Sequence, residues 1–260
     1  MEIANESHRS IELTVEVVGT PETVWTAIAT GPGISSWYVP HVVEERTGGA
    51  ATASFGEGPE MQMPGRVKVW EPPRRIVFDG GEGVGGLEFE WLVEPGSNGT
   101  CIVRLVNSGF GSGDMWDDQY DQMVGGWGLF MSNLQAHLAH FAGQPAKSML
   151  PSGMWNGSRG EVWLKLLGAL GIPLDVEAGA RMVVAGADAP PLAGTVMQAH
   201  DGRITLLLDT PCAGTALIAA EGTGEQTMVS VWSYLYGPER GDIVARDTQT
   251  WQQWLDDRAP

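Results

Sequence analysis

The chain has 260 residues, of which 43% are hydrophobic and 18% charged, so it can build one large buried core or two modest ones. It carries 32 Asp and Glu against 15 Lys and Arg, a formal net charge of −17 at pH 7. A field of this sign repels phosphate backbones and anionic lipid, so we expect neither nucleic-acid binding nor docking to a membrane surface.

Three further features predict a cytoplasmic protein without a disulfide framework. The segment from Met1 to Glu6 has neither the basic start nor the apolar core of a signal peptide. No apolar run approaches the roughly 18 residues that a spanning helix requires. The only two cysteines, Cys101 and Cys212, lie far apart, so we expect neither a disulfide scaffold nor a cysteine-based zinc site.

In chain order, the first half begins with a strand and a short helix. Alternating apolar residues predict a half-buried strand over 11–17. Thr20 is a good helix N-cap and Pro21 suits the first helical position, so a helix begins there. The Gly and Pro residues at 31–33 are expected to stop this helix, before a further short turn that packs Trp37.

A meander of strands and one long helix follow. Clusters of Gly and Pro separate the predicted strands at 51–55, 65–70, 75–78, 87–93 and 100–107. From 114 to 141 apolar residues recur at steps of three and four, which predicts a long amphipathic helix.

The second half repeats this order in a shorter form. A helix start at 158, strands near 194–206 and 224–236, and a terminal helix with Trp251 and Trp254 echo the first half. We therefore predict a domain at 1–143, a linker at 144–157 and a truncated second copy at 158–260 that lacks an obvious first strand.

Residues at 22–25, around Trp37, at 65–78 and at 126–134 resemble the SRPBCC (START-like) superfamily, most closely its branch related to the activator of Hsp90 ATPase. The resemblance covers 11–143 well and 158–257 weakly. It implies an α+β helix-grip fold (START-like, Bet v 1-like), in which a curved antiparallel sheet wraps a long C-terminal helix, here duplicated. It also implies an apolar cavity for a hydrophobic small molecule, or contacts to a partner protein.

One face of each strand and the inner stripe of the long helix are expected to line such a cavity. Alternation points Leu87, Phe89, Trp91 and Val93 inward, and places Cys101, Val103, Leu105 and Asn107 on one face of the next strand. Large, polarizable side chains suit an adaptable pocket, although core filling is the alternative for each. The candidate ligand-binding residues are Trp37, Phe55, Met61, Met63, Phe89, Trp91, Val103, Leu105, Asn107, Trp116, Tyr120, Met123 and Trp127.

Few residues are candidates for orienting a ligand or for acid–base catalysis. Asn107 is a lone polar group that either orients a ligand or bonds to turn backbone beside Gly109. His41, near the expected cavity mouth, and Tyr120 are the other weak acid or base candidates. Members of the superfamily often carry a histidine near the position of Asn107, and its absence here weakens an acid–base role.

Three motif-like patterns are interpreted structurally. The acidic residues Asp117, Asp118 and Asp121 open a helix, where the dipole favours them, rather than hold magnesium. The glycines at 81, 83 and 86 precede a predicted strand, so they are not a dinucleotide fingerprint. His137 and His140 are expected to face solvent or the helix end. We expect no metal and no cofactor.

Three functions are compatible with these features. The first, which we favour, is a hydrophobic small-molecule binding protein with its cavity in the N-terminal domain and without enzymatic activity. The second is a polyketide cyclase or aromatase, in which His41, Asn107 or Tyr120 moves protons. The third is a chaperone-associated interaction protein, with a protein partner or a homodimer, since residues 1–143 carry 19 acidic and 7 basic groups.

Overall fold

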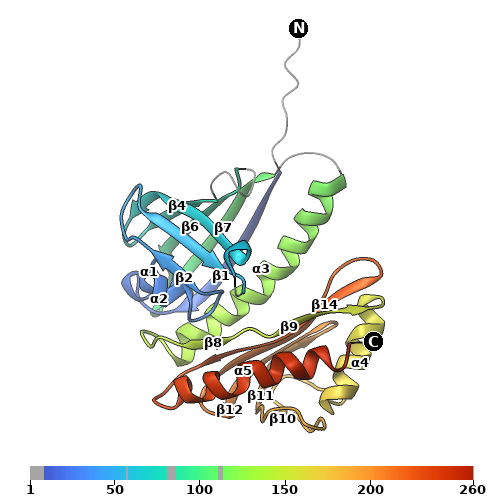
Figure 1. Ribbon diagram of the computed structural model, residues 1–260. Coiled ribbons are helices and arrows are strands. Elements are labelled where there is room, and N and C mark those ends of the chain that lie inside the picture. The colour runs from blue at the N-terminus through green and yellow to red at the C-terminus, as the bar shows by residue number, and fades with distance from the viewer. Residues whose placement is uncertain (1–8, 57, 81–85, 111–113, 260) are drawn as a thin grey trace. The chain divides into compact units, whose positions relative to one another are not determined.

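The computed structural model describes residues 9–56, 58–80, 86–110 and 114–259, with side chains for all of these except Arg9, 114–122, 124 and 125. The chain divides into two compact units, residues 1–143 and 144–260, which we call the N-terminal and C-terminal units (Figure 1). None of the helices within the described ranges is both long and apolar enough to cross a bilayer.

The N-terminal unit is an antiparallel sheet that packs against one long helix. Its strand order is β1-β7-β6-β5-β4-β3-β2, so the first strand pairs with the last and the others follow back in sequence. Its elements in chain order are β1 (Arg9–Val18), α1 (Pro21–Ala29), α2 (Gly31–Ile34), β2 (His41–Val43), β3 (Ala50–Ser54), η1 (Pro59–Met61), β4 (Gln62–Glu71), β5 (Arg75–Asp79), β6 (Glu88–Pro95), β7 (Thr100–Phe110) and α3 (Asp114–His140).

Two threonine caps start the short helices as side-chain chemistry predicts. Thr20 Oγ1 accepts from the Thr23 backbone N–H at 3.3 Å, with Pro21 at the start of α1. The segment at 31–33 does not simply end the helix. Thr30 Oγ1 accepts from the Gly33 N–H at 3.1 Å and caps a second helix, α2. The proline in its first turn is compatible with a helix, because a residue at this position needs no N–H to donate.

The C-terminal unit repeats this topology with a broken first strand. Its strand order is β10-β11-β12-β13-β14-β8, and β9 also pairs with β14, so the strands at the start again lie beside the last one. Its elements are β8 (Lys147–Met149), β9 (Ser152–Asn156), α4 (Arg159–Leu170), β10 (Arg181–Val183), β11 (Ala193–His200), β12 (Arg203–Thr210), β13 (Gly214–Glu221), β14 (Gln226–Leu235) and α5 (Arg240–Asp256).

The shared strand order confirms the α+β helix-grip class and the shorter second copy, but that copy does have a first strand. β8 and β9 lie inside the segment expected to be a linker at 144–157, and both pair antiparallel with β14. Pro151 separates them because it has no N–H to donate to the ladder. Its carbonyl still accepts from the Val231 N–H at 3.2 Å, which keeps the two pieces in line.

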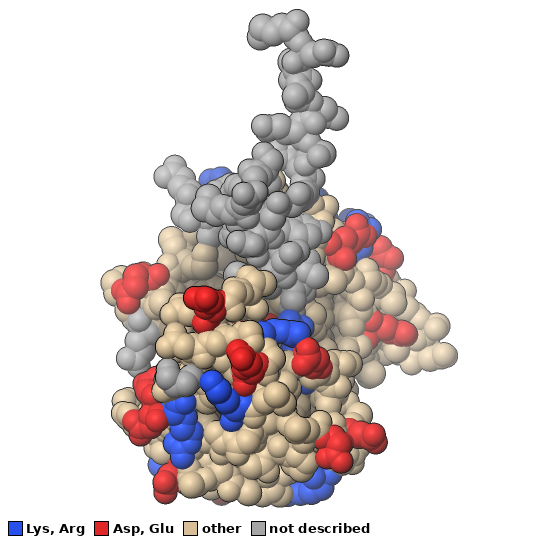
Figure 2. Space-filling view, turned by 90° about the vertical axis from the view of Figure 1, so that its right-hand side faces the viewer, with Lys and Arg blue, Asp and Glu red and all other residues tan. Residues whose placement is uncertain are grey.

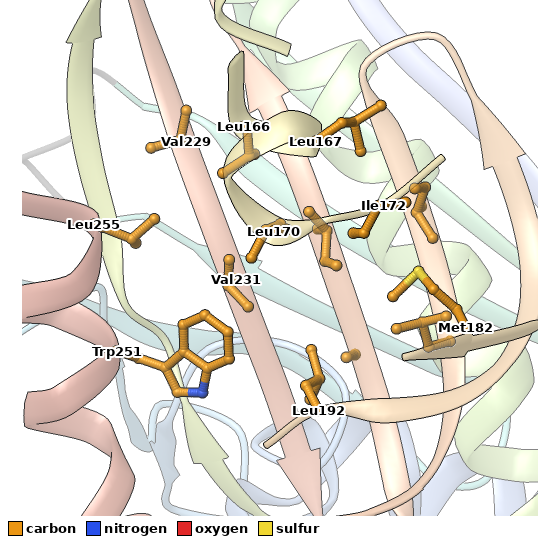
Figure 3. Packing of buried hydrophobic residues seen from close by; sticks show 14 of the residues in the cluster. Leu166, Leu167, Leu170, Ile172, Met182, Leu192, Val229, Val231, Trp251 and Leu255 are labelled. Atoms are coloured by element: carbon orange, nitrogen blue, oxygen red, sulfur yellow. The ribbon is translucent and has the colours of Figure 1, made fainter. Parts of the chain in front are cut away.

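The interior of the C-terminal unit is packed with aliphatic side chains and tryptophans. Trp251 and Leu255 of α5 lie toward Val229 and Val231 of β14 (Figure 3). Leu170, at the end of α4, is fully buried in the same cluster. The Trp155 Nε1–H donates to the Leu255 carbonyl at 3.1 Å, which ties β9 to α5. The space between α5 and its sheet therefore holds side chains of the unit itself.

Replacement by alanine should have opposite effects on the free energy of unfolding at two glycines of the C-terminal unit. A Cβ at Gly194 in β11 would lie 2.2 Å from the Leu207 carbonyl oxygen, whereas a Cβ at Gly168 in α4 meets nothing within 4 Å. Gly194→Ala should lower the free energy of unfolding by about 2 kcal/mol or more through backbone displacement. Gly168→Ala should raise it by about 0.5–1 kcal/mol through helix propensity.

Urea unfolding of the full chain, followed by circular dichroism, measures both changes. If Gly194→Ala left the unfolding midpoint unchanged, the close β11–β12 approach would be wrong.

Candidate functional site

The candidate site is built on the inner faces of β6 and β7. Their register places Phe89 opposite Asn107, Trp91 opposite Leu105 and Val93 opposite Val103. Opposed residues in an antiparallel pair share a face, so this set forms one surface toward α3. The described members of the face are buried, except for Phe89, which is half-buried. The alternation read from the sequence therefore gives the correct inward face.

A cluster of aromatic rings lies between this face and α3. The Trp127 ring, on α3, contacts Phe89 and Trp91, with ring centroids 5.9 and 5.6 Å apart. Trp37 packs edge-on against Trp91 at 5.6 Å and 77°. Such edge-to-face geometry is favourable because the positive ring edge meets the negative ring face. We call Trp37, Trp91 and Trp127, together with Tyr38 and Phe89, the aromatic cluster.

Tyr38 is the member of this cluster that was not among the candidate residues predicted from the sequence. Its ring centroid lies 5.1 Å from that of Trp127, 4.4 Å from that of Phe130 and 6.2 Å from that of Phe55. It follows Trp37 in the turn after α2, and the two rings stack at 5.8 Å and 28°. The only sequence signal was its position next to a residue already expected to be buried.

Three apolar side chains extend the cluster to the surface. Phe55, Met61 and Met63 have 38%, 37% and 39% of their surface exposed. Ala53 and Met63 pair across β3 and β4, and the Phe55 N–H donates to the Met61 carbonyl at 2.9 Å, which keeps these residues together. We call these three residues the apolar rim. Through Tyr38 and Phe55, ring contacts run without interruption from the interior to this rim.

Asn107 is fully buried and its hydrogen bonding is incomplete. Its Nδ2 donates to the Glu88 carbonyl at 3.1 Å, across the β6–β7 pair, and not to the turn beside Gly109. Its Oδ1 is buried without a hydrogen-bond partner in the described part of the chain. Buried polar atoms are nearly always bonded, so this acceptor is an exception that calls for an explanation.

The titratable groups near the cluster are held in neutral forms. Burial raises the pKa of the Tyr38 phenol far above its usual value. Burial also lowers the pKa of His41, partly offset by its hydrogen bond to the Val39 carbonyl at 2.8 Å from Nδ1. The two rings lie 5.5 Å apart. A neutral imidazole that donates from Nδ1 has Nε2 as its acceptor.

His137 is buried, contrary to the expectation that it faces solvent. Only 2% of its surface is exposed, and burial lowers its pKa to about 4. Asn133, one turn earlier on α3, is also buried and donates from Nδ2 to the Trp37 carbonyl at 2.8 Å. The inner stripe of α3 thus includes two buried polar residues, one of which, Asn133, fastens the helix to the turn after α2. A purely apolar stripe does not predict this. His140 is exposed, as expected.

The remaining candidate residues are placed as follows. Met123 is half-buried and packs against the N-terminal core. The side chains of Trp116 and Tyr120 lie outside the described residues, as do those of Asp117, Asp118 and Asp121. A strand, β6, and not a helix, follows the glycine-containing segment at 81–86. Among the side chains described, no three His, Cys, Asp or Glu groups come together as a metal site requires.

A hollow of about 660 Å³ lies on the C-terminal unit between the start of α4 and the turn before β14. Its polar groups already serve the helix. Glu161 accepts from the Ser158 backbone N–H at 3.1 Å and from its hydroxyl at 2.8 Å, a capping box that lowers the pKa of Glu161. This hollow is therefore explained by helix capping.

Charged residues occupy the opposite, solvent-facing side of the N-terminal sheet. Arg66 pairs with Asp79 at 2.8 Å, Arg75 with Glu90 at 2.6 Å and Arg104 with Glu12 at 3.0 Å. On the face shown in Figure 2, acidic groups are spread over the surface and Lys and Arg lie next to some of them. Exposed pairs of this kind add little stability.

An antiparallel sheet whose first and last strands pair, and which holds a long C-terminal helix over an aromatic interior, defines a helix-grip protein of the SRPBCC type. Residues 19–139 match the family model described as Activator of Hsp90 ATPase homolog 1-like protein. The N-terminal unit is therefore similar to this family, which confirms the resemblance read from the sequence.

Solved structures with similar folds fall into two groups by coverage. The Aha1 dimer from Colwellia psychrerythraea is 18% identical, with a TM-score of 0.43, over 50% of this chain and 96% of that one. Protein BH1534 from Bacillus halodurans is 23% identical, with a TM-score of 0.43, over 50% of this chain and 96% of that one. The di-domain ARO/CYC BexL from the BE-7585A biosynthetic pathway is 14% identical, with a TM-score of 0.43, over 96% of this chain and 95% of that one. No curated protein matches the chain.

Buried His137 predicts a specific loss of stability in mild acid. Because its pKa is about 4 in the folded chain and about 6.5 when unfolded, the unfolded state binds the proton first as the pH falls. The contribution of neutral His137 to the free energy of unfolding is fully present above pH 6.5 and is lost as the pH falls from 6.5 to about 4. Between pH 7.5 and pH 5 the free energy of unfolding of the wild type should fall by about 2 kcal/mol more than that of His137→Gln.

Urea unfolding of the wild type, His137→Gln and the exposed control His140→Gln at pH 7.5 and 5 measures this difference. His140→Gln should follow the wild type. Equal pH dependence in the wild type and His137→Gln would contradict the burial of a neutral imidazole.

Proposed function

We propose that the N-terminal unit binds a neutral hydrophobic small molecule against the aromatic cluster. The observation that carries this proposal is the continuous series of ring contacts from Trp91 through Trp127 and Tyr38 to Phe55 at the surface. Small-molecule sites are lined mainly by apolar and aromatic side chains with a few placed polar groups. The aromatic cluster, the apolar rim and Asn107 match that composition.

The electrostatics of the interior favour a ligand without charge. Tyr38, His41 and His137 all have pKa shifts that keep them neutral near pH 7, and burial is the cause of each. A charged ligand would lose its hydration without gaining an opposite charge from these groups. The ion pairs of the N-terminal sheet lie on its other face and offer none.

In this proposal the residues named from the sequence take two roles. Phe55, Met61 and Met63 form the entrance, because their partly exposed apolar surface lies where the ring contacts reach the outside. The inner lining comes from β6, β7, α3 and the turn after α2. Its proposed members are Trp37, Phe89, Trp91, Val103, Leu105, Asn107, Met123 and Trp127, to which we add Tyr38 because its ring contacts Trp127.

A second candidate function, cyclisation of a polyketide-like substrate, has one observation in its favour. His41 is a neutral imidazole whose Nδ1 is bonded to backbone, so its Nε2 is the basic atom, and it lies beside Tyr38 of the cluster. A general base needs this form at neutral pH. His41→Gln would abolish turnover by such an enzyme while leaving ligand affinity unchanged.

Binding of the neutral dye Nile red to the full chain tests the proposed function. The wild type should bind about one dye per chain, with enhanced and blue-shifted emission. Phe89→Glu should weaken binding at least tenfold, because a carboxylate then faces the apolar interior. Leu174→Glu, which changes a 70% exposed leucine of the C-terminal unit, is the matched control and should bind as the wild type does.

Circular dichroism must show Phe89→Glu to be folded for its dye binding to count. Equal affinity of the wild type and folded Phe89→Glu would place the dye elsewhere and reject the proposal.

A further inference from the structure

We infer that the natural ligand of the N-terminal unit presents a hydrogen-bond donor, a hydroxyl or an N–H, to Oδ1 of Asn107. This inference rests on the proposed function and adds the chemical class of the ligand. It would be an apolar molecule with a neutral donor, such as a phenol, an alcohol or an amide, rather than a carboxylate or a pure hydrocarbon.

The position of Asn107 makes its oxygen available to the interior alone. Asn107 has none of its surface exposed and lies on the inner face between Ile11 of β1 and Phe89 of β6. Its neighbour on the same face, Leu105, is equally buried. Among the described residues no donor reaches this acceptor, and it has no access to bulk water, so we infer that the donor belongs to a molecule that enters the interior.

The neighbouring backbone determines which amide atom is presented. Nδ2 donates to the Glu88 carbonyl at 3.1 Å. In the flipped orientation, Oδ1 would face that carbonyl and two acceptors would oppose each other. The hydrogen-bond pattern therefore assigns the oxygen, and not the nitrogen, as the unpaired atom.

Asn133 shows what a structural asparagine looks like in the same unit. It is equally buried, but its Nδ2 joins α3 to the Trp37 carbonyl, so its side chain links two separate elements. Asn107 joins two strands that the β6–β7 ladder already pairs over eight residue pairs. Its amide adds little to the fold and leaves an acceptor unpaired, which is the arrangement of a specificity group.

A matched pair of probes tests the inference on the full-length wild type by titration calorimetry. The probes are 2-naphthol and 2-methoxynaphthalene, which share a ring system but differ in the hydroxyl donor. The wild type should bind 2-naphthol about tenfold more tightly, the effect of one hydrogen bond to an otherwise unpaired buried acceptor. Equal affinities would overturn the inference while the proposed function stands.

Two variants locate the preference. Asn107→Leu keeps the side-chain size and should remove the preference for 2-naphthol while retaining affinity for 2-methoxynaphthalene. Leu105→Val, the adjacent control, should change both affinities together and keep their ratio. A preference that survives Asn107→Leu would overturn the inference, and if neither probe binds the wild type, the proposed function fails and the inference with it.

Stability gives an independent measurement. If Asn107 serves a ligand, Asn107→Leu should unfold at the same urea concentration as the wild type or a higher one, because an unpaired polar group has been removed. A clearly lower midpoint would assign Asn107 a structural role. The wild-type probe comparison remains decisive even if this variant does not fold.

Discussion

The N-terminal unit depends on how Trp37 is held. Its indole Nε1–H donates to the Ala27 carbonyl of α1 at 2.9 Å, its own carbonyl accepts from Asn133 of α3 at 2.8 Å, and its ring packs edge-on against Trp91 of β6. One residue in a turn thus connects two helices and the sheet. Because α3 cannot slide along the sheet without breaking the bond from Asn133, Trp127 is kept over the inner face. The geometry of the candidate site follows from this connection.

The two units use one strand order to build different interiors. In the N-terminal unit rings meet at their edges, polar groups reach inward, and apolar surface continues to the outside through Phe55. In the C-terminal unit Leu, Val and Ile fill the space beside Trp251, and the bond from Trp155 to the Leu255 carbonyl fastens the helix instead. Because one fold can enclose different interiors, the strand order alone does not assign a function to either unit.

Local patterns predicted much of this structure because they reflect local physics. Thr20 with Pro21 predicted where α1 begins, and alternation along β6 and β7 predicted the face that carries Trp91 and Asn107. The first strand of the C-terminal unit was missed because Pro151 interrupts it, although Met149 and Trp155, an even number of positions apart, are both buried. The burial of His137 was also missed, since a helix-end histidine ordinarily faces solvent and only tertiary packing decides otherwise. Partners distant in sequence, such as Asn133 and Trp37, leave no local pattern.

Buried polar groups distinguish what holds the N-terminal unit together from what the unit does. Asn133 has a partner on another element, and His137 adapts to burial by remaining neutral, so both are compatible with a stable closed interior. Asn107 differs, because its oxygen has no partner among the described residues and an apolar side chain of the same size would avoid the cost of burying it. A sequence under selection for stability alone would lose such a residue. In the proposed function, its place on the face that meets Trp127 gives this acceptor a role in ligand recognition.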